Sequence, residues 1–351
     1  MNLIHTASGR NVPRLQDFNA EISTFAVGTR KSKLALKQTE LAVEALTAAW
    51  PDYQYDVKAR DTAAGDIDKI TPFRDMPVKN LWTHELEALL LEKKLDILIH
   101  SLKDVPTQLP PGCEIGAVLE REDPRDAFVL KAGKPHCNIQ DLPAGAVVGT
   151  SSIRRGAQLA LKFPHLVIED MRGNINTRLN KLDAEDSKFD ALILAAAGLL
   201  RIDLGDRISQ YLDSENGGML YAVGQGAIGI ENRCNDLDVK TQINRINHLR
   251  TFLATNAERA LLRYLEGGCS APLGVETRWC TTSLLELKAI VVSTDGQQSV
   301  EVAIAKEIAS VEDADAFGTE VAQELLSKGA DKILAEIKAK KPTTVTDLEE
   351  K

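Results

Sequence analysis

Residues 95–106 read LDILIHSLKDVP, and this stretch decides the fold class. Its first six residues form a short, mostly aliphatic run, which is typical of a buried β-strand. The polar segment that follows carries Lys103 and Asp104, and Pro106 then fixes a turn. In open α/β sheets, ligands bind at the carboxyl ends of strands. The stretch therefore predicts a strand with functional side chains directly after it.

The same alternation of short strand-like runs and helical patterns extends through the first two-thirds of the chain. It predicts α/β units with mainly parallel sheets. Strands are expected at residues 24–28, 55–59, 95–100, 113–119, 127–130, 146–149, 166–171 and 191–195, and helices at 34–50, 83–93, 154–162 and 176–183. From residue 247 the sequence pattern changes. It predicts a helix at 256–266, strands at 284–293 and 300–308, and one long helix at about 313–338. This second pattern predicts a small α+β domain.

Length and composition narrow the function classes. At 351 residues the chain exceeds the size of a single core. Its five cysteines are scattered without a CxxC pair, which indicates reduced thiols inside a cell. A net charge of −9 argues against nucleic-acid binding, and no apolar run reaches membrane-spanning length. Because the basic residues are concentrated in a few short motifs, a small anionic ligand is expected.

Three predicted strand-to-helix turns carry arginines. Such turns present free backbone N–H groups and the positive end of a helix dipole, which suit anions. Arginines in the first helical turn cost about 0.3–1 kcal/mol each, and an anionic ligand would offset this cost. The alternative is that they pair with local carboxylates. The candidate residues are Arg30 and Ser32 in the first turn, Thr150, Ser151, Ser152, Arg154 and Arg155 in the second, and Arg172, Gly173 and Arg178 in the third.

Two single residues stand out for chemistry. Asp104 lies among basic groups and, as a carboxylate, could stabilise a developing cation; the alternative is that it only opens the turn before Pro106. Cys269 lies in LEGGCSAP (265–272), where glycines let a large group approach a thiolate that holds it covalently. The alternative for Cys269 is a small buried hydrophobe.

The glycine-dense stretch at 221–231, YAVGQGAIGIE, lacks the spacing of a dinucleotide loop. It predicts a strand approached closely by other backbone, or a hinge between domains.

Nine segments together resemble the porphobilinogen deaminase family, also called hydroxymethylbilane synthases. In family order they are GTRKSKLA (28–35), LWTHELE (81–87), HSLKDVPT (100–107), EDPRDAF (122–128), GTSSIRR (149–155), FPHL (163–166), MRGNINTRL (171–179), YAVGQGAIGIE (221–231) and LEGGCSAP (265–272). The resemblance is specific because no single motif carries it, and it is looser beyond Gly274. One stretch departs from the family, since Pro77 and Val78 replace a usual glycine pair.

The resemblance implies two periplasmic-binding-protein-like, doubly wound α/β domains and a small α+β domain that carries the cysteine. The implied boundaries are a disordered leader at 1–20, a first domain at 21–120 with 220–245, a second at 121–219 and a third at 246–351. It also implies a cytoplasmic monomer that has porphobilinogen as its substrate, needs no metal and binds neither nucleic acid nor membrane.

The implied activity deaminates four porphobilinogen molecules and joins them head-to-tail on a covalent dipyrromethane, releasing hydroxymethylbilane. Cys269 would bear this cofactor through a thioether, and Asp104 would be catalytic. The implied cofactor-binding residues are Ser101, Lys103, Asp104, Thr150, Ser151, Ser152, Arg154, Arg155, Arg172, Gly173, Gln225 and Cys269. The implied substrate-binding residues are Arg30, Ser32, Lys79, Trp82, Arg155, Arg172 and Arg178.

Two rival interpretations come from other classes. A two-lobed solute-binding protein would hold an anion without chemistry, but it would need neither the GGC motif nor a third domain. A phosphosugar or nucleotide enzyme would use the glycine-threonine turns for phosphate. It would not explain so many arginines beside a lone aspartate and a lone cysteine. A covalent adduct seen in the intact mass would separate the deaminase from both rivals.

Overall fold

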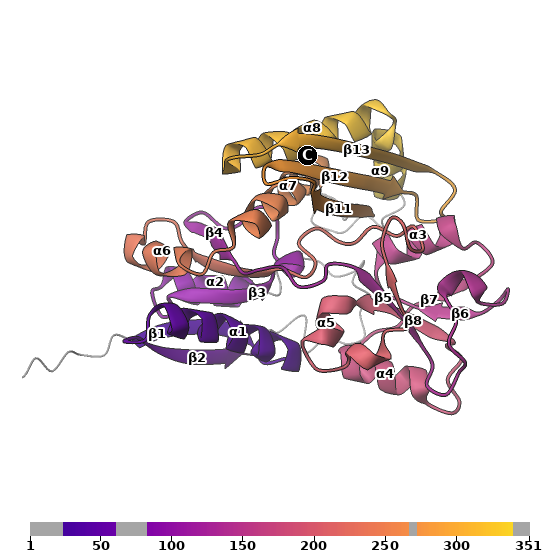
Figure 1. Ribbon diagram of the computed structural model, residues 1–351, viewed down its shortest axis with the longest axis horizontal. Coiled ribbons are helices and arrows are strands. Elements are labelled where there is room, and N and C mark those ends of the chain that lie inside the picture. The colour runs from indigo at the N-terminus through magenta and orange to yellow at the C-terminus, as the bar shows by residue number, and fades with distance from the viewer. Residues whose placement is uncertain (1–23, 61–82, 267–271, 340–351) are drawn as a thin grey trace, which may run out of the picture.

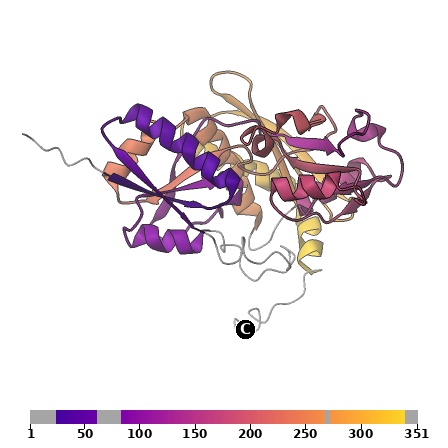
Figure 2. The same ribbon diagram turned by 90° about the horizontal axis from the view of Figure 1, so that it is seen from below.

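The computed structural model describes residues 24–60, 83–266 and 272–339. Two α/β lobes lie side by side, and a third domain covers both from one side (Figures 1 and 2). The predicted fold class, two doubly wound α/β domains with a small α+β domain, is confirmed. The expected leader at 1–20 and the positions of Lys79, Trp82 and Cys269 lie outside the described residues.

The first lobe is built on one five-stranded sheet whose strand order is β2-β1-β3-β10-β4. The strands are β1 (Thr24–Arg30), β2 (Gln54–Arg60), β3 (Ile97–Ser101), β4 (Cys113–Val118) and β10 (Ile228–Arg233). Helices α1 (Lys33–Ala49) and α6 (Leu237–Asn244) cover one face, and α2 (His84–Leu91) covers the other. Side chains alternate along β3, since Ile97 and Ile99 face α1 and α6 while Leu98 faces α2.

The second lobe repeats this plan with the order β7-β6-β8-β5-β9. Its strands are β5 (Asp126–Leu130), β6 (Val147–Gly149), β7 (Val167–Glu169), β8 (Ala191–Ala195) and β9 (Gln210–Leu212). Helix α3 (Ile153–Lys162) covers one face, and α4 (Ile175–Asp183) and α5 (Ala196–Leu200) cover the other. Single 3₁₀ turns lie at Leu102–Asp104 (η3), Ile139–Asp141 (η4) and Gly205–Arg207 (η5).

The chain crosses between the lobes twice, at residues 119–125 and 213–227. Each crossing delivers one reversed strand: β10 runs antiparallel to β3 and β4, and β5 runs antiparallel to β8 and β9. The other strands of each sheet share one direction, as the α/β pattern predicted. The glycine-dense stretch supplies both the second crossing and β10. A Cβ at Gly226 would lie 2.4 Å from the Glu122 carbonyl oxygen of the first crossing, which confirms the expected close backbone approach.

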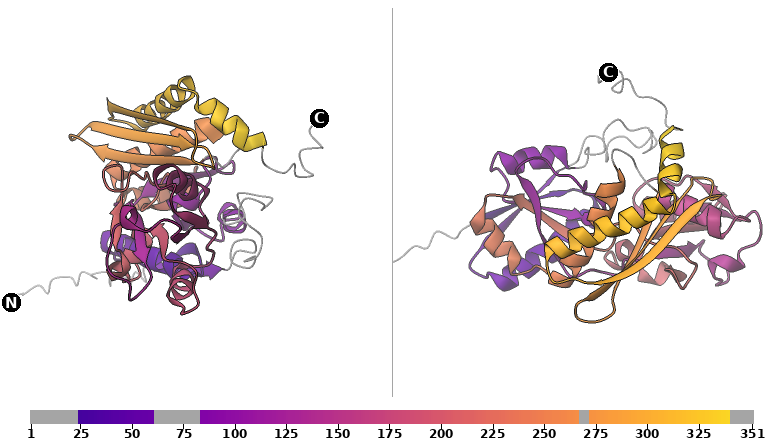
Figure 3. Two further views of the ribbon diagram at one scale, coloured as in Figure 1. Left: turned by 90° about the vertical axis from the view of Figure 1, so that its right-hand side faces the viewer. Right: turned by 90° about the horizontal axis from the view of Figure 1, so that it is seen from above.

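The third domain is a three-stranded antiparallel meander with helices packed on it (Figure 3). It comprises α7 (Leu249–Glu266), β11 (Leu273–Trp279), β12 (Leu284–Val292), β13 (Ser299–Glu307), α8 (Val311–Ser327) and α9 (Ala330–Ala339). Two expectations were wrong here. Helix α7 begins at Leu249 rather than at 256, and the long helix expected at 313–338 is two helices, because Gly329 takes a left-handed φ of +100° that ends α8.

The third domain is anchored to the two crossings rather than to one lobe. Glu258 of α7 forms an ion pair with Arg121 of the first crossing at 2.6 Å and accepts the backbone N–H of Gly224 in the second at 2.8 Å. The backbones of Tyr221 and Val275 also pair.

Candidate active site

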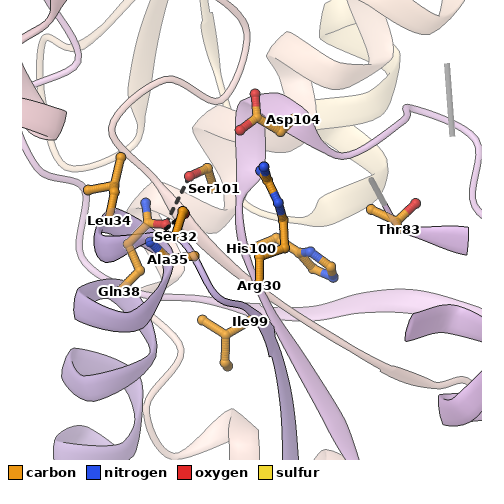
Figure 4. Close-up of a pocket in the computed structure, with 10 residues that line it drawn as sticks. All are labelled: Arg30, Ser32, Leu34, Ala35, Gln38, Thr83, Ile99, His100, Ser101 and Asp104. Carbon is orange, nitrogen blue, oxygen red and sulfur yellow. Dashed lines mark hydrogen bonds between the residues drawn. The ribbon is translucent and has the colours of Figure 1, made fainter. Parts of the chain in front are cut away.

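A pocket opens at the carboxyl ends of β1 and β3 in the first lobe, where the sequence pattern placed functional residues (Figure 4). It holds about 460 Å³ of empty space, part of which is open to solvent. Arg30, Ser32, Ser101 and Asp104 all line it, so the structure brings four predicted residues together. The other lining residues are Leu34, Ala35, Gln38, Thr83, Ile99 and His100.

Local geometry fixes several of these side chains. The Ser32 hydroxyl caps α1 by accepting the Ala35 N–H at 3.3 Å, and Ser101 donates to Gln38 Oε1 at 2.9 Å. Asp104 ends η3 and is exposed, so its carboxylate is accessible from the cleft. In Figure 4 the Arg30 side chain extends toward Asp104. The pocket therefore offers a cationic group and an accessible carboxylate together.

The second lobe presents the turn between β6 and α3, in which Ser152 caps the helix by accepting the Arg155 N–H. Arg154 and Arg155 follow, and both are buried. Arg154 Nη1 lies 2.7 Å from Asp126 Oδ2, and Arg155 Nε lies 2.9 Å from Asp126 Oδ1. The two arginines also donate to the carbonyl oxygens of Leu220 and Ile193, respectively.

Asp126 supplies a protein carboxylate for these arginines. Burial favours its neutral form, but the charges of Arg154 and Arg155 outweigh burial and hold the pKa of Asp126 well below its usual range. The cost of cations at the helix N-terminus is thus offset by a protein carboxylate, but this carboxylate is buried and distant in the chain instead of local, as the alternative had it. One carboxylate faces two guanidinium groups, so a surplus of positive charge remains.

This surplus extends across the cleft to the first lobe. Burial of the ammonium group lowers the pKa of Lys103 to about 8; Asp104 opposes this shift, whereas Arg155 adds to it. The Lys103 side chain is nevertheless partly open to solvent. Burial, followed by Arg155, lowers the pKa of Arg178 to about 10. Lys103 from one lobe and Arg155 and Arg178 from the other therefore act on a common region.

The third predicted turn leads into α4. Arg178 Nε donates to the Gly173 carbonyl oxygen at 2.7 Å, and Asn174 caps the helix. Gly173 has a φ of +121°, and a Cβ there would lie 2.8 Å from Thr177 Cγ2, so only glycine suits this position. Arg172 is half-buried beside this turn, and its charge also lowers the pKa of Arg178.

Gln225 lies on the second crossing and is buried. Its amide nitrogen donates to Asp126 Oδ1 at 2.9 Å and to the Pro124 carbonyl at 2.7 Å, and its amide oxygen accepts from Arg155 at 3.3 Å. It thus ties the two crossings to the buried arginine cluster. Thr150 is buried in the turn after β6, and Ser151 is half-buried there.

Sequence reasoning missed several residues that the structure places at the site. Asp126 belongs to the EDPRDAF segment, but its pairing with arginines 28 and 29 positions away leaves no local signal. Gln38, Thr83 and His100 line the pocket and were given no role. For His100 the signal was its position at the end of the predicted strand.

Two further features concern the described residues, 24–60, 83–266 and 272–339. Within them, no group of three or more His, Cys, Asp or Glu side chains is arranged to hold a metal ion. In the same ranges, no helix is long and apolar enough to span a membrane.

Fold and site together define a class: a two-lobed α/β protein whose cleft gathers cationic groups from both lobes around one accessible carboxylate, with a third domain fixed to the crossings. The comparisons with known proteins refine this class. The family description "Porphobilinogen deaminase, dipyromethane cofactor binding domain" matches residues 25–241, and "Porphobilinogen deaminase, C-terminal domain" matches residues 252–327.

Curated relatives agree with these matches. The chain is 49% identical over 327 residues to the porphobilinogen deaminase of Yarrowia lipolytica, covering 92% of this chain and 96% of that protein. It is 49% identical to that of Neurospora crassa (89% and 93%) and 45% identical to that of Saccharomyces cerevisiae (90% and 97%). The chain belongs to the porphobilinogen deaminase family, and its first two-thirds contain the family's dipyrromethane cofactor-binding domain.

Two solved structures that the chain resembles in fold are more distant in sequence. The BenM effector-binding domain with benzoate has a TM-score of 0.38 and 15% identity, covering 64% of this chain and 91% of that one. A probable amino-acid ABC transporter extracellular-binding protein from Bacillus subtilis has a TM-score of 0.37 and 13% identity, with coverages of 64% and 91%. Likenesses at this level carry no functional argument.

Proposed function

We propose that this protein deaminates porphobilinogen and joins four molecules head-to-tail on a covalently held dipyrromethane, releasing hydroxymethylbilane. The observation that carries the proposal is the cleft in which Lys103 and Asp104 of the first lobe meet Arg155 and Arg178 of the second. A growing chain of pyrroles brings two carboxylates with every unit, so it needs many cations and very few anions around it.

The cationic and hydroxyl side chains of the cleft fit a dipyrromethane, which carries carboxylates. Burial, with like-charge repulsion adding to it, lowers the pKa values of Lys103 and Arg178, and the carboxylates of the cofactor would favour their charged forms. Hydroxyl groups of the turn after β6 and the cations around them would hold these carboxylates, and Cys269 would carry the thioether. When bound, the cofactor supplies the nucleophilic pyrrole carbon. The residues that would hold it are Ser101, Lys103, Asp104, Thr150, Ser151, Ser152, Arg154, Arg155, Arg172, Gly173 and Gln225.

Asp104 is the residue proposed to stabilise charge. Its exposed carboxylate can accept pyrrole N–H groups and stabilise the cation that forms on the substrate as ammonia leaves. Arg30 and Ser32 line the same pocket and would bind the carboxylates of the incoming substrate. Arg155, Arg172 and Arg178 would bind from the second lobe, and Lys79 and Trp82 from the segment before α2.

The direct test is the intact mass of the purified protein with and without the cysteine. Wild-type protein should carry an added mass equal to one dipyrromethane, and Cys269→Ser should have the bare mass and no normal turnover. Cys280→Ser is the matched control, because Cys280 is an exposed free cysteine of the same domain. A bare wild-type mass together with no turnover of porphobilinogen would overturn the proposed function.

Further expectations belong to this proposal. The protein is a cytoplasmic monomer that binds neither nucleic acid nor membrane, as its acidic net charge of −9 and scattered cysteines support. Its domains are residues 21–120 with 220–245, residues 121–219, and residues 246–351. The double crossing and the anchor at Glu258 support this division. Light scattering of the purified protein would test the monomer.

A further inference from the structure

The turn that carries Asp104 is held by helix α7 of the third domain. Arg259 of α7 is buried, and its two terminal nitrogens donate to backbone carbonyl oxygens that follow Asp104 in the chain. Nη1 lies 3.0 Å from the Val105 oxygen, and Nη2 lies 2.6 Å from the Pro106 oxygen. These contacts join residues 154 and 153 positions apart, so no local sequence pattern could indicate them.

Apolar packing and the second crossing support the same turn. Leu102, which opens η3, and Val105, which follows it, are buried in one cluster, and Phe252 of α7 packs against that cluster. A Cβ at Gly224 would lie 3.2 Å from the Leu102 backbone carbonyl carbon, so the second crossing runs directly beside the η3 backbone. The turn is therefore enclosed by α7 and the second crossing, while its Asp104 side chain lines the pocket.

The contacts of Arg259 differ from those of its neighbour Glu258. Glu258 binds Arg121 and the Gly224 N–H, so it anchors the third domain to the two crossings. Arg259 instead reaches the Asp104 turn itself. Phe252 and Arg259 are seven residues apart, so they lie on the same side of α7 and meet the turn together.

The position of the Asp104 carboxylate matters for the role proposed for it. Electrostatic stabilisation is effective when the charge is already fixed at the place where the opposite charge develops. A displacement of about 1 Å at a reacting group can cost about 10²-fold in rate. Asp104 ends a 3₁₀ turn of only three residues, and 3₁₀ turns have poorer hydrogen-bond geometry than α-helices. Such a turn benefits from external support.

We propose that Arg259 is a positioning residue for Asp104. By holding the carbonyl groups of Val105 and Pro106, it fixes the turn so that the carboxylate stays where positive charge develops on the substrate. Arg259 acts through Asp104, and the third domain thereby takes part in the chemistry of the first lobe. This inference rests on the proposed function, because the reaction that the positioning serves is pyrrole addition.

The first experiment is a double-mutant cycle on single-turnover pyrrole addition by the holoenzyme, with cofactor loading confirmed by mass. Arg259→Met keeps the length of the stem but removes both donors, so addition should slow by about 10- to 100-fold. In an Asp104→Asn background the same substitution should slow addition by less than about threefold, because the group that it positions has already lost its charge. Arg259→Lys keeps a donor and should slow addition by a smaller factor, with the same dependence on Asp104.

Arg263→Met is the matched control for this cycle. Arg263 lies one turn further along α7 and forms an ion pair with Asp315 of α8 inside the third domain. The control should keep the wild-type rate in both backgrounds. Equal slowing by an Arg259 variant with and without the Asp104 charge would show that Arg259 acts independently of Asp104, which would overturn the proposal. An Arg259→Met rate equal to that of wild type would also overturn it.

The second experiment, amide hydrogen exchange of the purified full chain, does not depend on turnover. The Leu102 N–H donates to the Ala227 carbonyl oxygen and the Val105 N–H to that of Leu102, so exchange at residues 102–107 reports on the turn. Relative to wild type, Arg259→Met and Arg259→Lys should exchange at least about fivefold faster there, with β12 unchanged. Unchanged exchange at 102–107, or equal acceleration in β12, would show no positioning of the turn. An exchange difference as expected, with no porphobilinogen turnover in wild type, would count against the proposed function alone.

Discussion

The two lobes each place an aspartate among cations, but the aspartate of the second lobe is buried and paired whereas that of the first lobe is accessible. Asp126 of the second lobe is 0% exposed, and its oxygens accept from Arg154, Arg155 and Gln225. Asp104 of the first lobe ends a short 3₁₀ turn and faces the cleft. Charge alone therefore does not assign a role. A carboxylate whose acceptor positions are filled by protein holds the structure together, whereas an accessible one can act on a ligand.

The largest expected effect concerns Asp126, the buried aspartate of the second lobe. Asp126→Asn would leave Arg154 and Arg155 buried without a counter-charge. Removing one partner of a buried ion pair costs about 3–5 kcal/mol, so the free energy of unfolding should fall by that amount. Urea unfolding of wild type and variant at neutral pH would measure it. A variant as stable as wild type would show that the arginines relax to other partners.

The pH dependence of stability gives a control for this variant. Because the folded-state pKa of Asp126 lies below its unfolded value, its contribution is fully present above about pH 4 and is lost as pH falls toward the folded-state pKa. Wild type should therefore lose more stability in acid than Asp126→Asn does. Parallel acid titrations of the two proteins would contradict this assignment.

Substitution of Asp104, the accessible aspartate of the first lobe, should lower the reaction rate and leave the fold intact. Asp104→Asn keeps the size of the side chain but removes the charge that stabilises the substrate cation. Electrostatic stabilisation of this kind is typically worth about 10²–10³ in rate, equal to roughly 3–4 kcal/mol. Single-turnover addition, with the cofactor confirmed by mass, is the measurement. The rate of Asp104→Glu should fall between those of wild type and Asp104→Asn. An Asp104→Asn rate equal to that of wild type would contradict the proposed role.

The two arginines can be separated by a smaller effect. Arg154 bonds Asp126 and the Leu220 carbonyl. Arg155 lowers the pKa of Lys103 across the cleft more than Arg154 does, and it also lowers the pKa of Arg178 in its own lobe. Arg154→Gln should therefore mainly reduce stability, by about 1–3 kcal/mol. Arg155→Gln should mainly reduce cofactor loading. Thermal unfolding and intact mass, measured on both variants, would test the separation, and equal losses in both assays would refute it.

The smallest predicted effect concerns Lys103. Because its pKa is lowered to about 8, its charge is present below that pH and is lost as pH rises through it. Uptake of the cofactor by the cofactor-free protein should therefore weaken several-fold at alkaline pH, by the loss of one charge-assisted contact. Lys103→Arg keeps its charge there and is the matched control. If the pH profile of cofactor uptake is the same in both proteins, the titrating group lies elsewhere.

Some features of this molecule were predictable from local sequence because they depend on neighbours in the chain. Short apolar runs predicted most strands, and the polar turns after them predicted Arg30, Ser32 and Asp104, which share one pocket. Gly329 was a local signal for a break, since glycine often ends helices in the left-handed conformation. The helical pattern continues on both sides of it, so the sequence was interpreted as one helix.

The sequence by itself determined the fold class, the family and the identity of the candidate site residues, because these rest on local periodicity and on motifs whose order is preserved. Only the tertiary structure decided which charged groups are paired within the protein and which remain accessible to a ligand. Asp126 and the paired arginines, and equally Glu231 and His100, meet across strands and crossings far apart in the chain. Burial then sets whether each group serves as a structural ion pair or as an accessible reactant, since the cost of an unpaired charge depends on the water and partners around it.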